Sequence, residues 1–388
     1  MLELRYENKI DIRSVVNIMN EKVAIIGGGI VGASAAYYLS SLPGGSQISV
    51  TLYDDGAGQA TKAAAGIISP WLSKRRNQRW YQLAKDGATT LMTLARRANL
   101  ATDIYHQTGT IITRTNEKDL HDLYVLAQER QIDAPDMGDV ELLTAKEVQQ
   151  RIPLLTNPQP GIFVSGGARI DGEALVNELL AQAQQVNLTV KHERVILDSD
   201  GNLQASTGKQ HFDNVIIAAG PRLNDLLQPL GIKTAVRPQK GQLIELSVPD
   251  YNTQENMPAL MPEGERDFIP FGYGKLIVGA THDDEAGFNL TPTPEATQDL
   301  LDSAKQFADY LTADNITKVK VGTRAYSTDF APFFGRLKAH PQLLVASGLG
   351  ASGLTTGPLI GRLLAGTLIY GGIPDWSNYE KPLADYLS

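Results

Sequence analysis

A glycine-rich turn between a strand and a helix constrains the fold of this chain more than any other feature. Lys22–Ile26 (KVAII) is short, apolar and rich in β-branched residues, as expected of a buried parallel strand. The next residues, GGGIVG at 27–32, satisfy G-x-G-x-x-G through Gly27, Gly29 and Gly32, and an apolar helical pattern follows over 33–42. This order of strand, turn and helix predicts a Rossmann-like dinucleotide-binding unit in an α/β fold.

The spacing of the turn also has a chemical meaning. Its three glycines let the chain turn sharply, let a pyrophosphate approach the backbone and let the helix pack on the strand. The helix N-terminus then offers unpaired N–H groups to the phosphates. A second β-rich run, residues 48–53, ends at Asp54, 22 residues after Gly32, where a carboxylate can accept a ribose hydroxyl, and Asp55 beside it is an alternative. The motif predicts an ADP-containing dinucleotide and leaves NAD and FAD open.

Three later segments extend this pattern. Residues 56–67 are a run of small side chains, against which a flat ring and its phosphate tail can lie. Residues 211–221 read as an apolar strand that ends in Ala219 and Gly220. Residues 342–346 form another strand pattern that enters a glycine-rich turn from Gly348 onward, and a helix is expected over 358–370.

Composition narrows the class of protein. The 388 residues carry 35 Lys and Arg against 43 Asp and Glu, a net charge of -8, which argues against nucleic acid as the main partner. The absence of cysteine excludes disulfides, thiolate nucleophiles and cysteinyl links to a cofactor, and the six histidines show no metal-ligand spacing, so no metal is expected. Neither a signal peptide nor a membrane-spanning stretch is visible, which favours the cytoplasm. We expect residues 1–18 to be an N-terminal extension outside the fold, with a short ordered N-terminal arm as the alternative.

At this point the sequence resembles the FAD-dependent D-amino-acid oxidase superfamily, in particular its glycine oxidase, D-amino-acid dehydrogenase and sarcosine oxidase branch. The resemblance runs over nearly the whole chain from Met19. It rests on a series of motifs in a fixed order: KVAIIGGGIVG, LYDDG, ATKAAAG, VIIAAGP, RPQKGQ, KLIVGATHD, GTRAYSTDFAPFFGR and SGLGASGLTTGP.

The resemblance implies noncovalently bound FAD and a set of residues that hold it. Ile30 and Val31 would contact the pyrophosphate, Asp54 and Asp55 the adenosine ribose, and Val195 the adenine. Small side chains would line the phosphate tail and the flavin, namely Ala60, Thr61, Ala65, Gly66 and Ile67. The C-terminal turn would wrap the pyrimidine end of the flavin through Leu349, Gly350, Ala351, Ser352, Gly353, Leu354 and Thr355.

The resemblance also implies the substrate site and shows where this chain departs from its relatives. Arg324 matches the arginine that binds the substrate carboxylate. Ala351 stands where the glycine oxidase pattern has a second substrate arginine, and Asp267 stands in place of a tyrosine of the substrate roof. Both departures argue against glycine itself as the substrate and leave the FAD fold unaffected.

The expected architecture is a Rossmann-like FAD-binding domain with an interleaved α+β substrate domain that contains a mixed sheet. We assign residues 19–90, 150–236 and 323–388 to the FAD-binding domain. Residues 91–149 and 237–322 are assigned to the substrate domain.

The expected function is oxidation of the carbon–nitrogen bond of a small amino acid: a D-amino acid, glycine or an N-methyl glycine. Arg324 would hold the carboxylate through two parallel hydrogen bonds, hydride would pass to flavin N5, and the imine would hydrolyse. The alternatives are a nicotinamide-linked dehydrogenase and a tRNA-directed flavoprotein of the same superfamily. The sequence leaves open the electron acceptor, oxygen or a quinone, and whether the chain forms a homo-oligomer.

Overall fold

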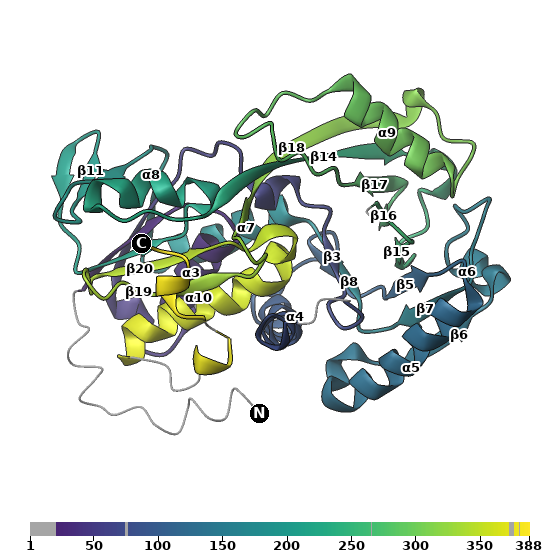
Figure 1. Cartoon of the computed structure of the whole chain (residues 1–388), viewed down its shortest axis with the longest axis horizontal. Coiled ribbons are helices and arrows are strands. Elements are labelled where there is room, and N and C mark those ends of the chain that lie inside the picture. The colour runs from purple at the N-terminus through teal and green to yellow at the C-terminus, as the bar shows by residue number, and fades with distance from the viewer. Residues whose placement is uncertain (1–20, 74–76, 265, 372–375, 380) are drawn as a thin grey trace.

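A computed structural model describes residues 21–73, 77–264, 266–371, 376–379 and 381–388. The expected N-terminal extension, residues 1–18, therefore lies outside the described residues. Two large sheets organise the rest of the chain, one in each half of the molecule as drawn in Figure 1. The predicted α/β fold class is confirmed.

The first sheet is the six-stranded sheet of the dinucleotide-binding half. Its order is β19 (Phe333–Arg336), β20 (Leu343–Ser347), β13 (Asn214–Ile217), β1 (Lys22–Ile26), β2 (Ser49–Tyr53) and β9 (Leu188–Lys191). From β20 to β9 all neighbours run parallel, and only β19 is antiparallel to its partner. The central strand β1 is almost wholly buried, which explains why its sequence is continuously apolar rather than alternating.

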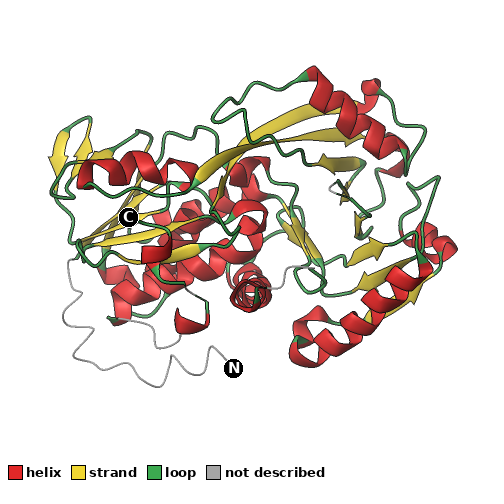
Figure 2. Ribbon diagram, in the orientation of Figure 1, coloured by secondary structure: helices red, strands yellow, loops and turns green. Residues whose placement is uncertain are grey.

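Helices cover this sheet and pack on one another (Figure 2). They are α3 (Ile30–Ser41), α4 (Gln78–Arg97), α7 (Gly172–Gln184) and α10 (Gly353–Tyr370). The helix α10 contacts both α3 and α4, and α3 contacts α7. We expected the C-terminal helix to begin at Pro358, but α10 begins five residues earlier. Proline lacks one N–H, so within the helix it costs a hydrogen bond without ending the helix.

The second sheet has eight strands and is mixed, as expected for the substrate half. Its order is β18 (Ile316–Tyr326), β14 (Arg237–Ser247), β17 (Lys275–Gly279), β16 (Asp267–Gly272), β15 (Ala259–Met261), β5 (Thr110–Thr113), β7 (Gly161–Val164) and β6 (Val140–Leu143). The long strands β14 and β18 pair over most of their length and extend toward the first sheet (Figure 1). They connect the two halves of the molecule.

One face of this second sheet packs against helices. Ile244, Phe268 and Val278 are buried against Leu300 and Leu301 of α9 (Pro294–Lys305). Around β6 and β7 lie α5 (Glu117–Asp133) and α6 (Ala145–Arg151). Because alternate residues of a strand point to opposite faces, the other face is left to meet the dinucleotide-binding half.

Smaller elements complete the fold. One three-stranded sheet consists of β3 (Ile67–Ile68), β8 (Ala168–Ile170) and β4 (Tyr105–His106). Another consists of β10 (Ile196–Leu197), β11 (Leu203–Ala205) and β12 (Gly208–Gln210), followed by the short helix α8 (Leu223–Leu227).

Sheet membership differs in two places from the domain boundaries that we expected. Strand β7, Gly161–Val164, pairs with β5 and β6 in the eight-stranded sheet, although residues from 150 onward were assigned to the FAD-binding part. The helix α4 runs without interruption through the boundary at residue 90 and packs on α10. The division into domains otherwise stays a prediction.

Candidate functional site

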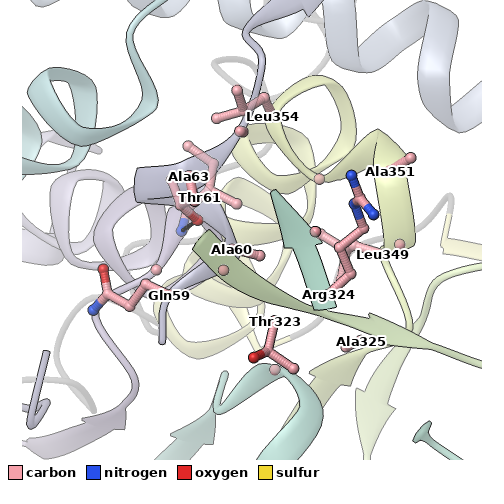
Figure 3. Close-up of a pocket in the computed structure, with 18 of the residues that line it drawn as sticks. Gln59, Ala60, Thr61, Ala63, Thr323, Arg324, Ala325, Leu349, Ala351 and Leu354 are labelled. Atoms are coloured by element: carbon pink, nitrogen blue, oxygen red, sulfur yellow. Dashed lines mark hydrogen bonds between the residues drawn. The ribbon is translucent and has the colours of Figure 1, made fainter. Parts of the chain in front are cut away.

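A cavity of about 710 Å³ lies where the two halves meet. Its walls come from segments far apart in the sequence, including the turn after β1, the segment after β2, the end of β18 and the turn before α10. This volume is in the upper part of the range for small-molecule and cofactor sites. Figure 3 shows part of the wall, with β18 passing below the C-terminal turn.

The glycine-rich turn after β1 forms one end of the cavity. Gly27 has φ +105°, and a Cβ there would lie 2.4 Å from the carbonyl oxygen of Ala218. A Cβ on Gly32 would lie 1.8 Å from the carbonyl oxygen of Gly27, so Gly32 allows the close packing of α3 on the turn. Gly27 and Gly29 line the cavity, whereas Gly32 is behind it. These positions match the roles that the motif predicts for its first and third glycines.

The helix α3 begins at Ile30, beside this turn. The Ile30 amide donates a hydrogen bond of 3.0 Å to Oγ1 of Thr61, a buried residue of the 3₁₀ turn Ala60–Ala63. This contact joins the glycine-rich turn to the segment that follows β2. Both segments line the same cavity, so a ligand placed there touches both.

The two acidic residues after β2 have different surroundings. The carboxylate of Asp54 accepts hydrogen bonds from the Gly28 amide and, at 2.7 Å, from the Gln59 side chain. Asp55 instead forms a salt bridge of 2.5 Å with Arg194. Partial burial alone would raise the pKa of Asp55, but the Ala57 amide and the Arg194 guanidinium stabilise its carboxylate and lower the pKa overall. Both acidic side chains line the cavity.

The segment that follows the two acidic residues packs closely against neighbouring backbone at the cavity wall. Gly66 has φ +90°, and a Cβ there would lie 2.1 Å from the carbonyl oxygen of Ile170. A Cβ on Gly322 of β18 would lie 2.8 Å from the Cβ of Ala63. The small side chains of this segment therefore let β18 approach the wall of the cavity.

The C-terminal turn forms the opposite wall. Gly350 has φ +53°, and a Cβ there would lie 2.6 Å from the ring of Tyr326 at the end of β18. The turn leads directly into α10, whose first residues, Gly353 to Thr355, line the cavity. The positive end of this long helix and its unpaired N–H groups therefore lie beside any ligand in the cavity.

Several polar atoms of the wall have no hydrogen-bond partner in the protein. Among the described residues that line the cavity, these are the Tyr53 hydroxyl, Oε1 of Gln59 and Oγ1 of Thr323. These three atoms are covered by protein and do not face the cavity. The glycines at the turn after β1 and the helix N-termini of α3 and α10 beside the cavity fit an extended dinucleotide such as FAD.

Arg324 reaches the cavity from β18 and is held in a defined position. Its Nη1 donates to Oε1 of Gln239 at 3.1 Å and to the carbonyl oxygen of Thr281 at 2.8 Å. The guanidinium lies over Gly241, where a Cβ would be 2.8 Å from its Cζ. Figure 3 shows the side chain extending toward Leu349 and Ala351, while Thr323 points to the other side of the strand. A planar guanidinium in this position can bind a carboxylate of a small ligand.

The residues expected in the site can now be placed. Those that line the cavity are Gly27, Gly29, Ile30, Val31, Asp54, Asp55, Ala60, Thr61, Ala65, Gly66, Ile67, Val195, Ala219, Gly220, Arg324, Leu349, Gly350, Ala351, Ser352, Gly353, Leu354 and Thr355. Gly32 and Gly348 do not line it. Gly348, with φ +76°, makes the turn that follows β20. The individual roles of these residues stay predictions.

Some cavity residues were not expected from the sequence. Gln59 and Thr323 flank residues that were predicted, and Gly241 belongs to the RPQKGQ motif without a role having been assigned to it. Gln239 of the same motif does not line the cavity but binds Arg324. Arg114, which follows β5, also lines the cavity. Pairing between strands that are far apart in the sequence brings such residues to the site. No local sequence pattern predicts this pairing.

Neither a membrane-spanning helix nor a metal site is found in the described part of the chain. None of its helices is both long and apolar enough to cross a bilayer. None of its His, Asp and Glu side chains gather in threes at a site suited to a metal ion.

Known proteins resemble this chain over most of its length. The family model DAO, FAD dependent oxidoreductase, matches residues 22–367. The uncharacterized oxidoreductase YurR of Bacillus subtilis is 36% identical over 88% of this chain and 93% of its own length. A glycine oxidase of Pseudomonas aeruginosa is 27% identical over 89% of this chain and 94% of its own.

A solved structure is also similar. The crystal structure of iminodiacetate oxidase from Chelativorans sp. BNC1 superimposes with a TM-score of 0.85 and 32% identity, covering 94% of this chain and 98% of that one. The family match and this level of similarity confirm the resemblance described above. The chain belongs to the DAO family of FAD-dependent oxidoreductases.

Proposed function

We propose that this chain oxidises the carbon–nitrogen bond of a small amino acid whose carboxylate binds Arg324. The observation that carries the proposal is the position of the Arg324 guanidinium, which lies inside the cavity and is fixed by Gln239 and the Thr281 carbonyl. Two parallel charge-assisted hydrogen bonds to a carboxylate give both affinity and orientation. The reacting carbon is then held at one place relative to the cofactor.

The residues that would hold FAD follow from the walls of the cavity. The turn after β1 and the start of α3 would face the pyrophosphate, and Asp54 the ribose. The 3₁₀ turn Ala60–Ala63 and the turn before α10 would enclose the flavin. When bound, FAD supplies the two-electron oxidation. Family membership favours FAD over the nicotinamide cofactor that the glycine motif alone left open.

The relatives support a substrate that carries both an amine and a carboxylate. Their names describe oxidases of glycine and of iminodiacetate, and each of these compounds has an amine nitrogen one carbon away from a carboxylate. This shared chemistry, rather than either compound, is what we extend to this chain.

The experiment is anaerobic reduction of the bound flavin, followed by its absorbance. The panel contains glycine, sarcosine, proline, iminodiacetate and D-amino acids. Reduction by one or more of them is the expected result, and repeating the active compounds in air then separates an oxidase from a dehydrogenase. A protein that binds FAD and is reduced by none of these amines would contradict the proposal.

Replacing the guanidinium tests the site itself. Arg324→Ala should retain FAD and slow flavin reduction about a hundredfold or more, because a charge-assisted pair of hydrogen bonds is lost. Arg151→Ala is the control, since Arg151 forms a salt bridge of 2.6 Å with Glu141 and does not line the cavity. Unchanged kinetics of flavin reduction in Arg324→Ala would show that Arg324 does not bind the substrate.

A further inference from the structure

Asp267 is a carboxyl group in the cavity wall that has no polar partner among the described residues. It is the first residue of β16, and its side chain lines the cavity. No hydrogen bond or ion pair joins it to any residue that the structure describes. Partial burial without a hydrogen-bond partner among the described residues disfavours the ionised form of a carboxyl group, so the position of Asp267 beside the cavity calls for an explanation.

Strand register places Asp267 on the same face of the sheet as Arg324. Asp267 pairs with Gly279 of β17, which pairs with Leu243 of β14. Two residues before Leu243 is Gly241, and two before that is Gln239, the partner of Arg324 on β18. Paired residues and residues two apart share a face, so the carboxyl and the guanidinium point to the same side.

That side is the one that meets the dinucleotide-binding half. Ile269, two residues after Asp267, packs with Phe271 against Ala65 and Ile67. The opposite face, with Phe268 and Val278, is buried in the core under α9. Asp267 therefore faces the cofactor side of the cavity.

Both charged groups border one cavity. Two glycines of the intervening strands, Gly241 of β14 and Gly279 of β17, line the same cavity, with the Arg324 guanidinium over Gly241 and the Leu243 side chain beside Gly279. Arg324 contacts the carbonyl of Thr281, while Asp267 pairs with Gly279, two residues earlier. The two groups share one face of the sheet and line one cavity, so a ligand in that part of the cavity lies between a cation and a carboxyl group.

The surroundings of Asp267 favour a carboxyl group whose pKa lies close to neutral pH. Among the described residues, the other charged or titratable side chains of this part of the cavity are Arg324 on β18, His282 after β17 and Arg114 after β5. Desolvation, with no compensating cation among the described residues, raises the pKa of Asp267 to about 7.

We propose that Asp267 binds the ammonium group of the substrate and accepts its proton, while Arg324 binds the carboxylate of the same molecule. A cation and an anion on one face of the same cavity are the electrostatic complement of an amino-acid zwitterion. This inference rests on the proposed function, amine oxidation, and adds to it a residue that acts on the reacting nitrogen.

The proton transfer has a simple balance. One N–H bond of the ammonium breaks, an O–H bond forms on the Asp267 carboxylate, and the electron pair stays on nitrogen. The lone pair of the neutral amine would then be available for the carbon–nitrogen double bond, and FAD, when bound, would supply the two-electron oxidation that takes up the α-hydrogen. A base whose pKa lies near the working pH is suited to this role.

The test compares the wild type with Asp267→Asn in anaerobic flavin reduction between pH 5 and pH 10, using an amine that reduces the wild-type flavin. In the wild type, the rate at low substrate concentration should rise with pH and level off above about pH 7. In Asp267→Asn it should be about a hundredfold lower at pH 7 and recover only where the amine loses its own proton. Asp267→Glu, which keeps a carboxylate, should restore the profile near neutrality.

The matched control is Asp299→Asn. Asp299 binds Arg266, the residue beside Asp267, at 2.9 Å, and it does not line the cavity. Its pH profile should equal that of the wild type. The same profile in the wild type and in Asp267→Asn would overturn the inference and leave amine oxidation standing, whereas a wild-type flavin that no amine reduces would instead contradict the proposed function.

A binding measurement tests Asp267 without turnover. Acetate carries a carboxylate for Arg324 and no amine, and its binding is followed by the change in flavin absorbance. Wild-type affinity should fall roughly tenfold from pH 6 to pH 8 as Asp267 becomes anionic, and Asp267→Asn should show no such fall. An equal pH dependence in the two proteins would place the Asp267 carboxyl away from the substrate.

Discussion

At the scale of the residue, the position of Arg324 depends on a chain of polar contacts that ends at the surface. Gln239 accepts a hydrogen bond from Arg324 and donates one of 2.8 Å to Asp284, which also binds Arg237. The Gln239 amide and the Arg237 guanidinium lower the pKa of Asp284, so its carboxylate stays ionised near neutral pH. The side-chain amide of Gln239 is thereby held with its oxygen toward Arg324.

Gly241 gives the most selective way to disturb this arrangement. In Gly241→Ala, the new methyl group would lie 2.8 Å from Cζ of Arg324 and would push the guanidinium from its place. Because a long side chain can move, we expect little loss of stability, retained FAD and a KM raised about tenfold for carboxylate substrates. Steady-state kinetics with the best amine of the panel measures this, and an unchanged KM would contradict it.

Asp267 also links pH to stability. Its pKa is raised in the folded protein to about 7, whereas an unfolded aspartate has a pKa of about 3.9. Between these values the folded state holds a proton that the unfolded state has released, so the contribution of Asp267 to stability falls as pH rises through this window.

Asp267→Asn removes this dependence. Its melting temperature should therefore exceed that of the wild type by more at pH 8 than at pH 5. Thermal unfolding of both proteins, each saturated with FAD, measures the difference. A constant gap between the two curves would contradict the raised pKa.

At the scale of the element, the stability cost of replacing a glycine differs widely between positions in and near the unit of β1, its turn and α3. Gly32→Ala would place a methyl group 1.8 Å from the Gly27 carbonyl oxygen, and the helix would have to move away from the strand. We expect a loss of about 3 kcal/mol of stability together with loss of FAD.

The control is Gly56→Ala in the next turn. Gly56 has φ +75° but nothing within 4 Å of an added Cβ, so only backbone strain of about 1 kcal/mol is expected. Urea unfolding and the FAD content of both variants measure the contrast. Equal effects would mean that close packing is not the reason for glycine at position 32.

At the scale of the whole molecule, the cavity lies among segments that belong to different parts of the fold. A cofactor that touches the turn after β1, the 3₁₀ turn Ala60–Ala63 and the turn before α10 ties these segments together. Binding to the folded state alone stabilises it by about 2.7 kcal/mol when FAD is at a hundred times its Kd.

The melting temperature should therefore rise steadily as FAD is added to protein from which it has been removed. Differential scanning calorimetry at several FAD concentrations measures this rise, with AMP as a partial ligand for comparison. A melting temperature that does not depend on FAD would exclude the cavity as the cofactor site.

The pattern of neighbouring residues in the sequence was enough to predict the dinucleotide-binding unit. The strand Lys22–Ile26 has the bounds that its apolar pattern predicts, and Gly27 and Gly32 occupy close contacts that their spacing implies. These features follow from neighbouring residues, whose conformations depend on the turn and on the periodicity of a short segment. The order of the later motifs then identified the family, which the similarity to known proteins confirms.

Tertiary structure alone decided which side chains share the cavity. Strand β7 joined the second sheet against the expected boundary, and the pairing of β14 with β17 and β18 put Asp267 on the face of Arg324, 57 positions away in the chain. The physical reason is that a strand shows in its sequence which residues alternate, but its partner and register depend on contacts with strands far along the chain. The sequence by itself thus determined the cofactor fold, and the assembled sheet decided what surrounds the substrate.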